Sequence, residues 1–194
     1  VVEEGVTSIG NYAFYQCAEL ATVELADSVA SFGSNSFASC YALESIKLPT
    51  AITEIPERCF SSCGALDEII WNENLTVIGS NAFYGCALGD TVLPEGITTI
   101  GQYAFGGCGS MTKLTLPSTL TAIGESAFGG CALTTVTIPE GTEVLDAGGL
   151  VSGVHGQLGQ TDVNAVHRRM AQCDVAQRST AAHVGSVGEQ LCGH

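Results

Sequence analysis

The sequence predicts an α/β repeat solenoid, a fold in which one short unit is stacked on copies of itself. A phenylalanine recurs every 22 or 23 residues, and a cysteine follows each of these phenylalanines by three residues. The phenylalanines are Phe14, Phe37, Phe60, Phe83, Phe105 and Phe128. The cysteines are Cys17, Cys40, Cys63, Cys86, Cys108 and Cys131. A fixed period of this length is typical of a solenoid, because such a unit buries its apolar face only against its neighbours.

The first half of each unit reads Ile-Gly-x-x-Ala-Phe-x-x-Cys, as in IGQYAFGGC at 100–108. Its apolar residues fall at positions i, i+4, i+5 and i+8, which is typical of a short helical or 3₁₀ turn with one buried face. We expect the repeated cysteines to be small, buried, free thiols. Disulfides and metal binding are the alternatives. Disulfides are disfavoured because equivalent side chains of stacked units point in the same direction.

The second half of each unit reads Leu-x-x-Val-x-Leu, as in LATVEL at 20–25, LESIKL at 43–48 and LTTVTI at 133–138. This alternation predicts a short strand with one buried face. Prolines that directly follow such segments end the strand, because proline cannot donate a ladder hydrogen bond. These prolines are Pro49, Pro94, Pro117 and Pro139. We expect the strands to form one parallel sheet with neighbours roughly 4.8 Å apart.

These units resemble the BspA-like class of leucine-rich repeats, in which IGxxAFxxC is followed by LxxVxLP. The resemblance covers residues 1–145, about six repeats that start in the middle of one, so we expect the chain to be part of a longer protein. It implies a right-handed coil with one parallel β-sheet and short helical or 3₁₀ turns on the opposite side. It also implies a surface or secreted microbial protein that acts in adhesion and binding.

Two departures from the repeat stand out. The segments 86–88 and 131–133, which run from the cysteine to the leucine, are each one residue shorter than the equivalent segment 108–111, which indicates tighter coils. Trp71 and Asn72 stand where other units have leucine and proline.

The balance of charge limits the kinds of partner. The chain of 194 residues carries a formal net charge of −14. Phosphate contacts need a basic footprint, so we expect no nucleic acid partner. No apolar run approaches the ~18–20 residues that span a bilayer, so we expect no membrane insertion. We expect a monomeric solenoid.

Residues 146–194 have a different composition, with all four histidines and no aromatic residue. They are predicted to be an atypical C-terminal tail, partly disordered, with one possible helix at 162–176. A cap over the solenoid end, a disordered linker and a segment of doubtful coding origin remain alternatives. The tail has zinc-ligand residue types but no tight ligand pair, so we expect no metal and no other cofactor.

Motifs of catalysis are not found: there is no G-x-S-x-G, H-E-x-x-H, Walker loop or G-x-G-x-x-G. We therefore expect no enzyme. The sequence and the resemblance favour a module for protein–protein recognition or adhesion, on the cell surface or secreted, with a host or cell-surface protein as ligand. One alternative is a structural spacer without a specific ligand. A second is a non-catalytic fragment of a larger enzyme.

The candidate binding surface consists of the side chains that flank the central residue of each strand and point outward. At its centre Ile70 and Val92 put apolar groups on neighbouring coils, with acidic residues nearby. An exposed apolar patch rimmed by charge is typical of a contact site. The alternative is an ordinary sheet surface whose composition reflects strand propensity. The candidate residues are Glu24, Lys47, Glu68, Ile70, Asp90, Val92, Lys113 and Thr115.

Overall fold

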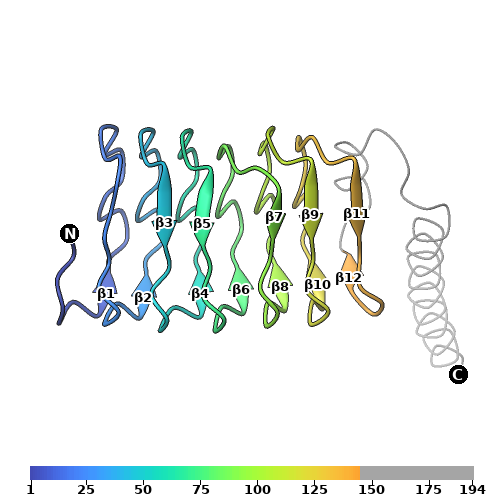
Figure 1. Cartoon of the computed structure of the whole chain (residues 1–194), viewed down its shortest axis with the longest axis horizontal. Helices are drawn as coiled ribbons and strands as arrows, with labels where there is room; N and C mark the ends of the chain where they lie inside the picture. Colours follow the sequence, from blue (N-terminus) through green and yellow to red (C-terminus); the bar gives the residue numbers. More distant parts are fainter. Residues whose placement is uncertain (145–194) are drawn as a thin grey trace, which may run out of the picture. The chain divides into compact units, whose positions relative to one another are not determined.

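The computed structural model describes residues 1–144, which form a solenoid of stacked coils (Figure 1). Each coil contributes short strands that pair in parallel with the equivalent strands of its neighbours. The predicted solenoid of parallel strands is therefore confirmed. The predictions for the tail, including the helix at 162–176, lie outside the described residues.

The predicted strands form the first line of pairing, and each is two or three residues long. They are β3 (Ser45–Lys47), β5 (Glu68–Ile70), β7 (Thr91–Val92), β9 (Lys113–Thr115) and β11 (Thr135–Thr137). The prediction of one continuous sheet needs correction, because β3 pairs with β5, and β7 pairs with β9 and β9 with β11, but β5 and β7 are not hydrogen-bonded. In the first coil the pattern at 20–25 forms only a parallel bridge between Leu25 and Val2.

A second line of parallel pairing was not predicted. Each of its strands ends on the isoleucine of the Ile-Gly pattern or on the equivalent residue. This residue is buried in each coil whose burial is described, whereas the residue before it points outward. The strands are β1 (Ser8–Ile9), β2 (Ser31–Phe32), β4 (Glu54–Ile55), β6 (Val77–Ile78), β8 (Thr99–Ile100), β10 (Ala122–Ile123) and β12 (Glu143–Val144). Here β4, β6, β8, β10 and β12 form a continuous sheet, and β1 pairs with β2.

The segments between the two lines of strands are turns, and no helix occurs within residues 1–144. The expected helical or 3₁₀ turns are thus a wrong prediction, because each turn contains left-handed residues, such as Tyr103 (φ 51°) and Gly107 (φ 75°). Successive N–H groups alternate between two kinds of acceptor. The Phe105 N–H donates to the Ala127 carbonyl of the next coil at 2.8 Å, whereas the Gly106 N–H donates to Tyr103 in its own turn at 2.9 Å.

The phenylalanine rings stack along the interior of the coils. Neighbouring rings have centroids 5.1–5.8 Å apart and are within 19° of parallel. The rings from Phe37 to Phe128 are fully buried, whereas Phe14 of the first coil is only partly buried. The period of the sequence therefore places one buried ring over the next.

Each buried repeat cysteine holds two coils together through the phenylalanine carbonyl. The Cys86 thiol donates to the Phe60 carbonyl at 3.2 Å, and that oxygen also accepts the Cys63 N–H at 3.2 Å. The same thiol contact recurs for Cys40, Cys63, Cys108 and Cys131. A small side chain with a weak donor therefore fits this position.

The prediction of buried free thiols is confirmed for these cysteines and is wrong for one. Cys17 is exposed, because in the described chain the first coil has a neighbour on one side only. Cys59, which lies outside the repeat pattern, is buried with its sulfur 3.2 Å from the Ser36 hydroxyl oxygen.

Phe83→Ala should lower the free energy of unfolding by about 3–5 kcal/mol, because it leaves a cavity between two stacked rings. Urea denaturation followed by circular dichroism measures the change. The adjacent Tyr84 is exposed, so Tyr84→Ala should change stability far less. A loss below about 1 kcal/mol for Phe83→Ala would contradict the stacked core.

The Cys86 and Cys59 thiols should resist alkylation in the native protein, because burial raises the pKa of Cys86 to about 12 and also raises that of Cys59. Iodoacetamide at pH 8 should modify Cys17 rapidly and Cys86 only in denaturant. Peptide mapping by mass spectrometry separates the sites. Rapid native labelling of Cys86 would show that the coil opens locally or that the thiol is not buried.

The same pKa shift predicts loss of stability in alkali. An unfolded thiol ionises near its ordinary value of 9.0, whereas the folded Cys86 thiol stays protonated to about 12. Ionisation of this thiol should therefore not change the free energy of unfolding below pH 9 and should lower it between pH 9 and 12. Cys86→Ala should make the fall less steep.

Candidate functional site

The outward side chains of the first line of strands form one surface, which we call the strand face. All eight candidate residues predicted for it are exposed. Candidate residues at equivalent positions of neighbouring coils lie side by side where the strands pair. Lys47 lies beside Ile70 in β3 and β5, and Val92 lies beside Thr115 in β7 and β9. Seven candidate residues thus lie in or directly beside the strands in two groups, on either side of the gap between β5 and β7, whereas Glu24 lies in a segment of the first coil that forms no strand.

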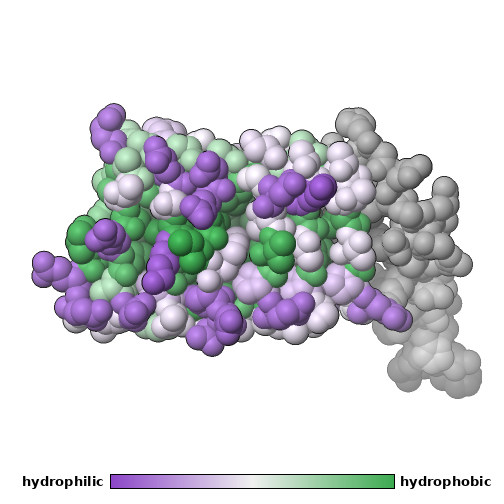
Figure 2. All heavy atoms as spheres, in the orientation of Figure 1, coloured by the Kyte–Doolittle hydropathy of each residue, from purple (hydrophilic) through white to green (hydrophobic). Residues whose placement is uncertain are grey.

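Two apolar side chains are prominent on the strand face. Ile70 is 50% exposed and Val92 is 69% exposed. In Figure 2 hydrophobic residues gather in a band across the middle of the face viewed, which includes the region of β5 and β7, with hydrophilic residues on both sides. Large exposed aliphatic groups in such a setting are characteristic of contact sites.

A hollow of about 220 Å³ lies between β5 and β7. We call it the β5–β7 hollow. Its lining combines apolar residues with three carboxylates. The lining residues are Asp67, Glu68, Ile69, Trp71, Leu88, Asp90, Thr91 and Val92.

The hollow coincides with the two sequence departures. Val92 follows Cys86 by six positions, whereas Ile70 follows Cys63 by seven, so the strand of the fourth coil starts one residue early. Trp71 occupies the position of a strand-ending leucine, is only partly buried, and meets the Phe83 ring edge-on at a centroid distance of 5.7 Å. The segment 131–133 is equally short, yet β11 pairs with β9, so the shortening alone does not prevent pairing. We attribute the missing strand pairing to the shortened segment together with the larger side chain of Trp71.

Asp90 connects the shortened coil to the next one. Its Oδ1 atom accepts hydrogen bonds from the Thr112 N–H at 3.1 Å, the Thr112 hydroxyl at 2.7 Å and the Lys113 N–H at 2.8 Å. These bonds, the Thr112 hydroxyl first, hold the pKa of this exposed carboxyl below its usual value. In the next pair of coils a backbone carbonyl accepts the equivalent hydrogen bond, since the Thr134 N–H donates to the Thr112 carbonyl at 3.0 Å.

Asn72 fixes the chain directly after Trp71. Its side-chain amide is buried and donates to the Pro49 carbonyl at 2.7 Å and the Ile52 carbonyl at 3.0 Å. Its carbonyl oxygen accepts the Asn74 N–H at 2.8 Å. The sequence singled out Asn72 as a departure but gave it no role, and the structure shows that it joins two coils beside the hollow.

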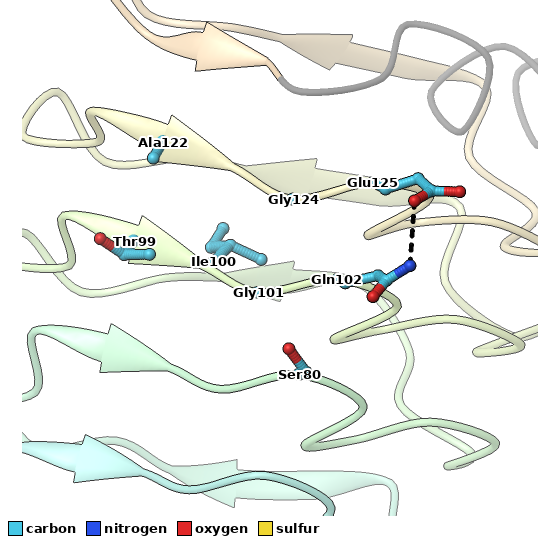
Figure 3. A pocket seen from close by; sticks show the side chains of 8 residues that line it. All are labelled: Ser80, Thr99, Ile100, Gly101, Gln102, Ala122, Gly124 and Glu125. Carbon is cyan, nitrogen blue, oxygen red and sulfur yellow. Dashed lines mark hydrogen bonds between the residues drawn. The ribbon is translucent and has the colours of Figure 1, made fainter.

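A second and larger hollow, of about 590 Å³, lies along the other line of strands (Figure 3). Glycines line it where neighbouring coils approach closely: a Cβ at Gly101 would lie 2.6 Å from the Ser80 nitrogen. Gln102 and Glu125 lie together at one end of it, on neighbouring coils, with the amide nitrogen donating to the carboxylate at 3.0 Å. It is wide and open, and Glu125 is the one charged residue in its lining, which gives it less definition than the β5–β7 hollow.

The described residues offer little for catalysis or metal binding. All four histidines lie in residues 146–194. Within residues 1–144, no group of three or more histidine, cysteine or acidic side chains is arranged to hold a metal ion. In the same residues no helix is long and apolar enough to cross a membrane.

Five residues that line the hollow were not predicted from the sequence as parts of a site: Asp67, Ile69, Trp71, Leu88 and Thr91. Trp71 and the short segment 86–88 were visible as irregularities of the repeat. Their combined effect on strand pairing was not visible, because it depends on how two coils meet.

Known proteins support the repeat assignment. The family model for the BspA type leucine rich repeat region matches in six copies, over residues 1–108 and 76–148. A crystal structure of a leucine-rich repeat protein of T. pallidum is similar, with 29% identity and a TM-score of 0.75, over 84% of this chain and 79% of that chain. No curated protein matches the chain.

Two other crystal structures of leucine-rich repeat proteins are also similar. The protein from Eubacterium ventriosum is 27% identical with a TM-score of 0.65, over 71% of this chain and 37% of that chain. The protein from Bacteroides ovatus has the same fold at 24% identity and a TM-score of 0.53, over 74% of this chain and 51% of that chain. This chain therefore spans about half of the Bacteroides protein and less of the Eubacterium protein.

The family model covers the whole described solenoid, and its description agrees with the resemblance inferred from the repeats. The chain belongs to the BspA-type leucine-rich repeat family.

Proposed function

We propose that the protein is a recognition module that binds a partner protein through the strand face, and that it has no catalytic activity. The observation that carries the proposal is the exposure of Ile70 and Val92, at 50% and 69%, on a surface whose backbone is held by strand pairing on either side. Burying such aliphatic groups against a partner is favourable by roughly 1.5–3 kcal/mol each.

The strand face is suited to binding because it is already ordered. Its side chains project from strands whose neighbours fix them, so a partner meets a surface that loses little conformational freedom. Polar and charged side chains lie on the same and neighbouring strands as the two aliphatic groups: Lys47, Glu68, Lys113 and Thr115. An apolar centre with a polar rim is the usual anatomy of a protein interface.

The proposal extends to where the protein acts. We propose a location on the cell surface or outside the cell, and a host or cell-surface protein as ligand. Support comes from membership in the BspA-type repeat family and from the acidic charge, which disfavours nucleic acid. We propose that the solenoid itself acts as a monomer.

The double substitution Ile70→Asp and Val92→Asp should weaken partner binding at least about 100-fold, because interface energy concentrates in a few central residues. Both side chains point to solvent, so the coils should stay folded. The immobilised chain would first capture a partner from a host-cell surface extract. Surface plasmon resonance with the purified partner would then compare the variants, and circular dichroism would check the fold.

The matched control carries the same charges on other exposed side chains, Tyr41→Asp and Tyr84→Asp, which are 55% and 44% exposed. Gly106 is unsuitable for this purpose, because a Cβ there would lie 2.9 Å from the Tyr84 ring. If the control loses binding and the Ile70/Val92 variant keeps it, the strand face is the wrong surface. If no partner binds the unaltered chain, the protein is better described as a spacer.

A further inference from the structure

We propose that the β5–β7 hollow binds an arginine side chain of the partner protein, with the guanidinium at the carboxylates and the aliphatic stem against Ile69 and Trp71. The inference rests on the proposed recognition function and names the chemistry that this function would use. It is carried by the size of the hollow, the partly buried Ile69 and Trp71 in its lining, and three acidic groups without a salt-bridge partner in residues 1–144.

The size of the hollow favours a single side chain. Its volume is about 220 Å³, which is less than the ~300–1,000 Å³ of pockets that enclose a drug-sized ligand. Ile69 and Trp71 are partly buried and supply the apolar surface that an entering aliphatic stem would contact, whereas Leu88 is buried and the rest of the lining is mostly polar. A guanidinium packs on an aromatic ring more favourably than an ammonium group does, so Trp71 favours arginine over lysine.

Charge is the second argument. Residues 1–144 contain sixteen aspartates and glutamates against Lys47, Arg58 and Lys113. The one ion pair in this range joins Arg58 to Glu57, at 3.8 Å, and neither residue lines the hollow. Asp67, Glu68 and Asp90 thus form a negative rim without a salt-bridge partner in the described part of the chain. A cationic side chain is the complement of this rim.

The geometry of Asp90 adds direction. All three of its hydrogen bonds end on Oδ1, and within residues 1–144 none ends on Oδ2. The carboxylate is therefore held in one orientation by the next coil while one oxygen is left to accept. The same bonds keep the group ionised, as its lowered pKa indicates. A fixed carboxylate with a free oxygen is a favourable acceptor for a guanidinium N–H.

The absence of strand pairing opens the site. Strands β5 and β7 each pair on their far side, with β3 and β9, but not with each other. The space that a paired neighbour would close therefore remains between them. An arginine entering here would lie between Glu68 of β5 and Val92 of β7, at the centre of the strand face.

Trp71 makes the proposal directly measurable, because it is the one tryptophan of the chain. The full chain would be titrated with the peptide N-acetyl-Leu-Arg-Leu-amide while indole fluorescence is recorded. A second titration would use the same peptide with citrulline, a neutral analogue of arginine with nearly the same shape. We expect a saturable change with the arginine peptide, weaker at high salt, and at least roughly tenfold weaker binding of the citrulline peptide.

The double variant Asp67→Asn and Glu68→Gln should weaken binding of the arginine peptide roughly tenfold and leave binding of the citrulline peptide unchanged. Neither side chain makes a hydrogen bond or ion pair in the described structure, so the coils should remain folded, whereas Asp90 variants would also disturb β9. The matched control is Glu19→Gln and Glu54→Gln, which alters the net charge equally on other coils and should bind like the unaltered chain.

Three results would overturn the inference: no saturable change with the arginine peptide up to millimolar concentration, equal binding of the two peptides, or equal weakening by the control variant. None of these decides whether the strand face binds a protein, because that test depends on Ile70 and Val92 and on a captured partner. Failure of the arginine site and failure of the recognition function are thus separate outcomes.

Discussion

The contact between one coil and the next determines the described structure. Three lines of hydrogen bonds cross it: two lines of short parallel strands, and the turns, in which every second N–H donates to the neighbouring coil. The stacked rings from Phe14 to Phe128 and the buried thiols fill the space inside these lines. No coil has a core of its own, so each coil's stability depends on its neighbours.

This dependence explains which parts of the fold can be predicted from the sequence. The stacked ring at Phe83 and the thiol at Cys86 each demand one kind of side chain, so they appear as letters at a fixed period. The second line of strands shows only one inward residue per coil, such as Ile100, which is too short for a period of two to be recognised. The turns escape prediction because their left-handed positions carry unrelated residues, for example Tyr103 and Ser126.

The candidate site likewise has features that can be predicted from the sequence and features that cannot. Alternation within a strand places Lys47, Ile70 and Val92 on the outer face, and the structure agrees. The β5–β7 hollow depends on a relation between two coils, in which a shortened segment meets the bulk of Trp71. The sequence of a single repeat does not show how that repeat meets the next one. It becomes visible only when neighbouring coils are compared in three dimensions.

The hollow costs hydrogen bonds between two strands, and side chains join the coils around it instead. Strands β5 and β7 forgo the hydrogen bonds that join β3 to β5 and β7 to β9. Two side chains bridge coils around the gap: Asp90 reaches forward to the fifth coil, and Asn72 reaches back to the second. Neither bond draws β5 and β7 together. Both bonds join coils on the far sides of the gap and fix the chain at its two edges, so this irregular place in the solenoid is also a well-defined one.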